Sequence, residues 1–158
     1  MIRPGSRHDA RFLRDMLHHA YYWRERSAPQ DPTEGSVQRY VMNWGRPGDA
    51  AVIALDDVGS AVGAAWYRLF KVSEPGYGFV DEQTPELSIA VVPSRRGKGF
   101  GDELLDALLA QALRDGFTQV SLSVEPDNPA LRLYERHNFH KVGESGGSST
   151  MVAQLGST

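Results

Sequence analysis

The chain has 158 residues, and its content of 41% apolar and 9% aromatic residues can supply the hydrophobic core of one domain. Its formal net charge of −3 argues against a general nucleic-acid binder. It has no cysteine, which excludes disulfides, thiolate metal sites and a cysteine nucleophile. It shows neither a signal-like apolar start nor a run of about 18 apolar residues, as a membrane span requires. We therefore expect a single domain over residues 1–158, located in the cytoplasm, with no membrane and no nucleic-acid partner.

The first half of the chain predicts a short strand, two helices and a strand hairpin. Ser6 and Asp9 have the spacing of a capping box, and apolar residues at helical spacing follow them. A loop with two prolines separates this helix from a second, shorter one, which Gly45 and Pro47 end. In order, the expected elements are a strand at 1–3, helices at 6–22 and 36–44, and strands at 51–55 and 61–70.

The second half begins with a loop at 72–85 and then alternates strands with helices. The helix in its middle has the clearest leucine stripe of the chain, and Gly116 is placed to end it. Asn138 can adopt the left-handed conformation that ends the last helix. In order, the expected elements are a strand at 86–92, a helix at 101–115, a strand at 119–124, a helix at 127–136, and strands at 139–142 and 150–155. This order predicts a layered α/β or α+β fold with a mixed sheet.

Residues 86–101 combine a strand, a proline-containing bend and a basic, glycine-rich loop directly before the leucine-striped helix. Glycine has no Cβ, so the backbone N–H groups of such a loop can approach an anion closely. The helix adds unpaired N–H groups and the positive end of its dipole. The segment therefore predicts a pyrophosphate-binding site. Its glycines and basic residues are Gly97, Gly99 and Gly101 with Arg95, Arg96 and Lys98.

Two common nucleotide motifs do not fit this loop. The chain contains no Gly-x4-Gly-Lys-Ser/Thr phosphate loop. The dinucleotide pattern Gly-x-Gly-x-x-Gly fails because Asp102 stands where its third glycine belongs. A tight strand-to-helix turn with solvated basic side chains remains the alternative to an anion site.

The run Arg96-Gly97-Lys98-Gly99-Phe100-Gly101 resembles the Arg/Gln-x-x-Gly-x-Gly/Ala acyl-CoA loop of the GNAT N-acetyltransferase superfamily. A second segment, at 125–139, resembles another motif of the family and lies at the expected distance. The resemblance is strong over 86–142, and the first 70 residues fit in element order only. It implies a GNAT-like α/β (α+β) fold, with a mixed, mostly antiparallel sheet of about six to seven strands and helices on both faces.

The resemblance implies acetyl-CoA as co-substrate and no metal. The pantetheine arm would pair with the strand near Val91 and Val92, and a strand N–H would polarise the acetyl carbonyl. An amine would attack the thioester directly. The pyrophosphate would bind the loop formed by Arg96, Gly97, Lys98, Gly99, Phe100 and Gly101.

Direct attack requires a neutral amine, so a general base is expected. By resemblance this base is Glu86, with a water relay from Asp81 or Glu82 as the rival. The alternative for Glu86 is a solvated carboxylate at the strand end. Tyr134 matches the family's general acid, which protonates the departing CoA thiolate, and the alternative is a packed helix aromatic. Asn128 would hydrogen-bond the pantetheine or cap its own helix.

The resemblance implies an acceptor site near the first helices and the loop before the central strand. Aromatic rings and carboxylates there suit a cationic amine, although the rings could instead form the core or the surface of a homodimer. We expect an N-acetyltransferase acting on a primary amine of a small molecule, or of a peptide or protein. The alternatives are a non-catalytic acyl-CoA-binding module and an acyltransferase that uses another acyl-CoA. His18 and His19 should lie on different helix faces, and no metal site is expected. The candidate acceptor residues are Tyr22, Trp23, Trp66, Asp81 and Glu82.

Overall fold

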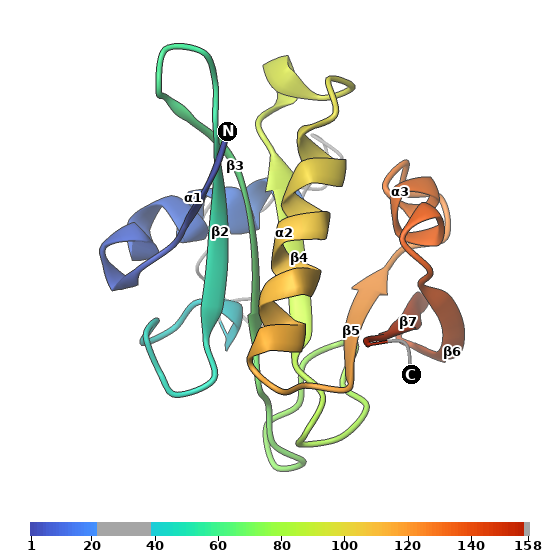
Figure 1. Ribbon diagram of the computed structural model, residues 1–158. Coiled ribbons are helices and arrows are strands. Elements are labelled where there is room, and N and C mark those ends of the chain that lie inside the picture. The colour runs from blue at the N-terminus through green and yellow to red at the C-terminus, as the bar shows by residue number, and fades with distance from the viewer. Residues whose placement is uncertain (22–38, 157–158) are drawn as a thin grey trace. The chain divides into compact units, whose positions relative to one another are not determined.

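The structure is a computed structural model that describes residues 1–21 and 39–156. Two of the candidate acceptor residues, Tyr22 and Trp23, lie outside the described residues. The elements alternate between strands and helices much as the sequence predicts (Figure 1). In chain order they are β1 (Ile2–Pro4), a 3₁₀ helix (Arg7–Asp9), α1 (Ala10–Tyr21), β2 (Ala50–Leu55), β3 (Ala61–Arg68), β4 (Glu86–Val91), a second 3₁₀ helix (Pro93–Arg95), α2 (Phe100–Arg114), β5 (Gln119–Val124), α3 (Leu131–Arg136), β6 (His140–Ser145) and β7 (Ser148–Gln154).

The strands form one seven-stranded sheet in the order β1-β2-β3-β4-β5-β7-β6. β1 with β2, β2 with β3, β5 with β7 and β6 with β7 are antiparallel, whereas β4 and β5 are parallel. The predicted mixed, mostly antiparallel sheet is therefore confirmed. Among the described residues, no helix is long and apolar enough to cross a membrane.

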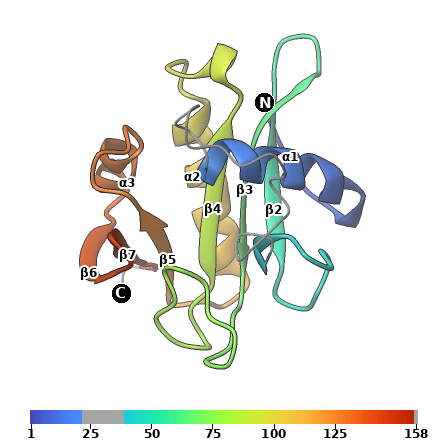
Figure 2. The ribbon, with the colours of Figure 1, turned by 180° about the vertical axis from the view of Figure 1, so that it is seen from behind.

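The chain divides into two compact units, which are described separately. In the first unit, α1 lies on one face of β2 and β3 and the start of α2 on the other (Figure 1 and Figure 2). In the second unit, β5 pairs with β7 over its whole length, and its Val120 and Leu122 are buried. The first unit comprises Met1–Tyr67 and Ser88–Leu108, and the second Arg68–Leu87 and Leu109–Thr158.

The apolar stripes of the helices build the core of the first unit. Leu13 and Leu17 on α1 are fully buried, as are Leu104, Leu105 and Leu108 on α2. These residues recur at the three- and four-residue spacing that places side chains on one helix face. The core therefore follows from the same periodicity that predicts the helices.

The capping box at the start of the first helix is confirmed. The hydroxyl of Ser6 accepts a hydrogen bond from the backbone N–H of His8, and the carboxylate of Asp9 accepts one from the N–H of Ser6. The turn that these bonds close is a 3₁₀ helix, so the α-helix itself begins at Ala10.

Two helix boundaries differ from prediction. Of the helix expected at 36–44, residues 36–38 lie outside the described part, residues 39–40 are in a 3₁₀ conformation and residues 41–43 form a turn, so the described part is not an α-helix. The left-handed φ of 55° at Asn43 breaks a helical path there. The helix expected from residue 127 begins at Leu131, because residues 125–130 form a turn in which Asn128 N–H donates to Glu125 O.

The predicted helix ends at Gly116 and Asn138 are confirmed, with φ of 89° and 69°. After α2, Gly116 N–H donates to Leu113 O and Phe117 N–H to Ala112 O. This pair of bonds defines the Schellman motif, which satisfies carbonyls that a helix end leaves unpaired.

The loop at 72–85 packs against β5 at Gly78, a contact that no sequence pattern indicates. A Cβ added to Gly78 would lie 2.6 Å from the carbonyl carbon of Leu122 and 2.7 Å from its oxygen. Both atoms belong to backbone and cannot rotate away, so only glycine fits here.

We expect Gly78→Ala to lower the free energy of unfolding by about 1–3 kcal/mol, the usual cost of overpacking. Gly143→Ala is the matched control, since a Cβ there meets nothing within 4 Å, and it should change stability by less than about 0.5 kcal/mol. Urea denaturation of both variants measures the difference. Equal stabilities would contradict the close packing of the loop on β5.

Candidate functional site

The glycine-rich loop adopts the alternating backbone that anion sites use. Gly97 and Gly99 have φ of 77° and 88°, whereas Lys98 between them has no positive φ. Alternation of left- and right-handed residues turns successive N–H groups toward a common concavity. A Cβ added at Gly97 or Gly99 would meet nothing within 4 Å. The glycines are therefore required by their backbone conformation, and the space beside them is open to a ligand.

The N–H groups of this loop remain available as donors. The N–H of Arg95 donates to Val92 O, and the first bond of α2 runs from Glu103 N–H to Gly99 O. Within the described residues, the backbone N–H groups of Gly97, Lys98 and Gly99 donate to no backbone carbonyl. Three donors at the start of a helix that begins at Phe100 can bind a phosphate.

Two of the three basic side chains of the loop bond to other parts of the protein, and the third is exposed. Arg95 pairs with Asp56 at 3.5 Å and so joins the loop to the β2–β3 turn. Nε of Arg96 donates to Val91 O at 3.1 Å, which bends this side chain back over the end of β4. Lys98 is exposed and has no ion pair within the described part of the chain. Lys98 is thus the basic side chain most ready to contact an anion.

The two residues predicted to pair with pantetheine differ in availability. The N–H of Val92 already donates to Val62 O at 2.8 Å, so Val92 faces β3. Main-chain groups of neighbouring strand residues point to opposite edges, so those of Val91 face away from β3. Because Val91 O already accepts from Arg96 Nε, the main-chain group that this geometry leaves for a ligand pairing along the strand is the N–H of Val91, and not that of Val92.

Glu86 begins β4 and is only 1% exposed. It stands opposite Ser121 in the parallel pairing of β4 with β5. The alternative of a solvated carboxylate at the strand end is therefore wrong. The same unit also buries Arg68, which is 2% exposed. Placing charges in such an environment is costly unless they are compensated, a feature that is common at functional sites.

Tyr134 lies on α3, and the turn that ends this helix holds it in place. Phe139 N–H donates to Tyr134 O and Asn138 N–H to Glu135 O, which forms a second Schellman motif. The rings of Tyr134 and Phe139 meet edge to face, with centroids 6.0 Å apart. Burial raises the pKa of the Tyr134 phenol above its ordinary value. The phenol therefore stays protonated at neutral pH and can donate a hydrogen bond.

Asn128 orders the turn before α3 but does not cap the helix itself, whose N-cap is Ala130 and has no side-chain capping bond. Its side-chain oxygen accepts a hydrogen bond from the N–H of Ala130 at 2.9 Å. This bond closes the turn that leads into α3. The predicted contact with pantetheine stays a prediction.

The acceptor candidates that the structure describes all make hydrogen bonds within the protein. Trp66 is 1% exposed and donates its indole N–H to Tyr40 O at 3.2 Å, so it is a core residue. Asp81 accepts a hydrogen bond from Gln83 N–H, and Glu82 accepts one from Val72 N–H, so both carboxylates order the loop at 72–85.

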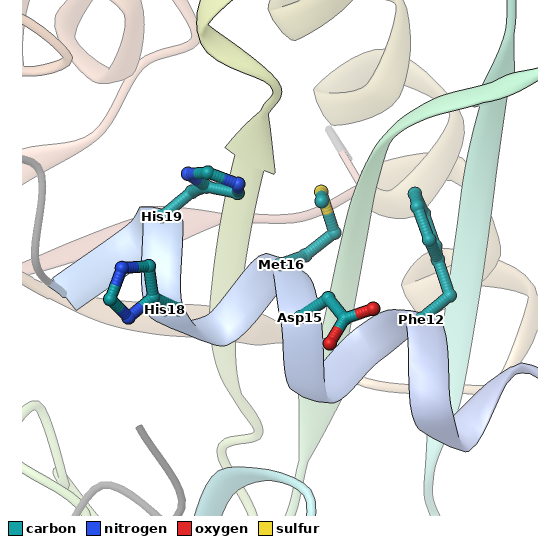
Figure 3. Close-up of a pocket in the computed structure, with 5 residues that line it drawn as sticks. All are labelled: Phe12, Asp15, Met16, His18 and His19. Carbon is teal, nitrogen blue, oxygen red and sulfur yellow. The ribbon is translucent and has the colours of Figure 1, made fainter. Parts of the chain in front are cut away.

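A hollow on α1 brings together residues that the sequence analysis did not group. It has a volume of about 520 Å³ and a lining of aromatic, acidic and thioether side chains (Figure 3). His18 and His19 both line it, with ring centroids 5.7 Å apart. Among the described residues, no group of three possible ligands could hold a metal ion. The lining residues are Phe12, Asp15, Met16, His18 and His19.

The sequence spacing of most of these residues indicates that they share one side of α1. Positions 12, 15, 16 and 19 lie three, four and seven residues apart, which places them along one side of a helix. Burial, followed by the charge of Arg96 and the neighbouring His18, lowers the pKa of His19, and Asp15 opposes this effect. The His19 imidazole is therefore neutral at pH 7.

Curated relatives of this chain include two acetyltransferases of amino acids. An L-methionine sulfoximine/L-methionine sulfone acetyltransferase from Pseudomonas aeruginosa is 32% identical over 108 residues, which are 68% of this chain and 60% of the relative. An L-2,4-diaminobutyric acid acetyltransferase from Nocardia farcinica is 29% identical over 117 residues, which are 70% of this chain and 53% of that protein. The chain thus spans less than two thirds of the length of these relatives.

Solved structures share the fold over almost the whole chain. A putative acetyltransferase from Salmonella typhimurium, solved with its cofactor acetyl-CoA, has a TM-score of 0.71 at 23% identity, covering 100% of this chain and 95% of its own. A phosphinothricin acetyltransferase from Sinorhizobium meliloti, solved with acetyl-CoA, has a TM-score of 0.69 at 22% identity, covering 99% and 88%. The model of the Acetyltransferase (GNAT) family matches residues 11–139, which is most of the sequence. The chain therefore belongs to the GNAT acetyltransferase family.

Proposed function

We propose that this chain transfers an acetyl group from acetyl-CoA to a primary amine of a small molecule. The observation that carries the proposal is the loop at Gly97, Lys98 and Gly99 before α2, whose N–H groups donate to no backbone carbonyl among the described residues. Its open, left-handed glycines fit a pyrophosphate without rearrangement of the backbone. Membership of the family supplies the reaction class.

In the proposed reaction, the amine nitrogen forms a bond to the thioester carbon and the bond from carbon to sulfur breaks. Glu86 acts as a base toward the nitrogen, and Tyr134 donates its phenolic proton to the departing thiolate. Burial keeps the Tyr134 phenol protonated, so that it can donate a hydrogen bond to the departing thiolate, and a carboxylate removed from water responds strongly to a nearby reacting group. Val91 would align the pantetheine along β4.

The acceptor that we propose is an amino acid or a similar small amine. The support comes from the two curated relatives, which are named for acetylation of methionine sulfoximine or sulfone and of diaminobutyric acid. These compounds share an amine and a carboxylate on a small framework. L-methionine sulfoximine and L-2,4-diaminobutyrate are therefore the first acceptors to test.

Acetyl-CoA should raise the melting temperature of the protein, as a ligand of the native state must. We expect Gly99→Ala to abolish this rise, because a Cβ would enter the open side of the loop and disfavour φ of 88°. Gly147→Ala is the matched control, since Gly147 has the same φ of 88° in an equally open turn. Thermal shift with and without acetyl-CoA measures both variants.

Both variants should lose about 1 kcal/mol of stability from backbone strain. Only the loop variant should lose the response to acetyl-CoA. A wild-type protein without any shift would refute the proposed ligand. If Gly99→Ala keeps the full acetyl-CoA thermal shift, the anion does not bind at this loop.

Tyr134→Phe should lower kcat by about 100-fold or more, because general acid catalysis contributes that much. Phenylalanine keeps the ring and its contact with Phe139, so the acetyl-CoA shift and the urea midpoint should stay near the wild-type values. Thiol release from acetyl-CoA with each of the two amino acids measures the rate. Full activity of this variant would remove Tyr134 from the mechanism. Tight binding with no turnover on a broad amine panel would instead indicate a non-catalytic acyl-CoA-binding module.

A further inference from the structure

The hollow on α1 lies close to the end of β4 at which the proposed reaction would take place. Arg96 links the two, because its Nε donates to Val91 O while its charge acts on the half-buried His19. Figure 3 shows the His19 ring on the side of α1 next to the tip of β4. All of these residues belong to the same compact unit. Arg96 therefore acts both on the strand end and on the histidine at the edge of the hollow.

The lining of the hollow suits an amine. Asp15 is exposed and offers a carboxylate to a cation, while Phe12 and Met16 offer apolar surface to the carbon chain beside it. Its volume of about 520 Å³ exceeds the size of an amino acid and leaves room for water. An ammonium group bound by Asp15 would lie one helical turn from His19.

Acetylation of an amine removes two protons from its nitrogen. The ammonium loses one proton to become a nucleophile, and the nitrogen loses a second once its bond to the acetyl carbon has formed. One of these protons ends on the CoA sulfur, and the other must reach the solvent. Glu86, which is 1% exposed, is poorly placed to release a proton to water. A second proton acceptor with access to solvent could carry this remaining proton from the amine to water.

We infer that His19 is a further catalytic residue, whose imidazole takes the first proton from the acceptor ammonium in the α1 hollow and passes it to water. This inference rests on the proposed function. Three charged or titratable groups act electrostatically on the His19 imidazole, namely Arg96 on the loop and His18 and Asp15 on α1. The Arg96 guanidinium disfavours the imidazolium, so the proton leaves readily once it has been taken. The neutral imidazole is then restored for the next turnover.

The test compares His19→Gln with wild type in thiol-release assays, using L-methionine sulfoximine and L-2,4-diaminobutyrate as the amines. At about pH 7 the variant should be roughly 100-fold slower, the usual contribution of a general base. At about pH 9.5 much of the amine is already neutral in solution, so the difference should shrink to less than about fivefold. His8→Gln is the control, because His8 is an exposed histidine of the same unit outside the hollow.

A second variant guards against a purely structural effect. His19→Ala should be equally slow at about pH 7, and free imidazole should restore part of its rate by entering the open hollow. The acetyl-CoA thermal shift should match wild type in both His19 variants.

Rapid turnover by His19→Gln at pH 7 would overturn the inference and leave the proposed function intact. An equal loss at both pH values, a lost thermal shift or no rescue by imidazole would also overturn it. Failure of the wild type with every amine would overturn the proposed function itself.

Discussion

The structure depends on the left-handed backbone at Gly97 and Gly99. Only that conformation turns the three N–H groups of the loop away from protein acceptors and toward open space. An uncompensated row of donors would be costly in the interior, and residues 97–99 are accordingly exposed at the surface. The strand before it and the helix after it fix where the proposed anion would bind.

The proposed reaction separates tasks that need different surroundings. The proposed base Glu86 and the proposed acid Tyr134 are buried, and a low dielectric strengthens their effect on a developing charge. The hollow on α1 is open, which suits capture of an amine and release of a proton. A fold that places buried and open sites on different elements can adjust the acceptor without disturbing the chemistry of the thioester.

Much of this arrangement could be predicted, because local rules set it. The alternating glycines of the loop, the capping box at Ser6 and the left-handed turn at Asn138 all follow from short-range backbone preferences. The burial of Glu86 could not be predicted, since it depends on what packs around β4 rather than on β4 itself. The helix expected at 36–44 and the start of α3 were misplaced where local turns compete with helix. His18 and His19 were assigned to separate faces, although a hollow wide enough can be lined by both.

The ion pair between Asp56 and Arg95 has a consequence for folding kinetics. It joins residues 39 positions apart in the sequence, whereas the turn that holds Tyr134 uses partners within five positions. Contacts between distant residues have to wait for chain closure, and local ones do not. We expect the α3 turn to form early and the loop to gain its anchor late. At high ionic strength this part-exposed pair weakens, and the delay should lengthen.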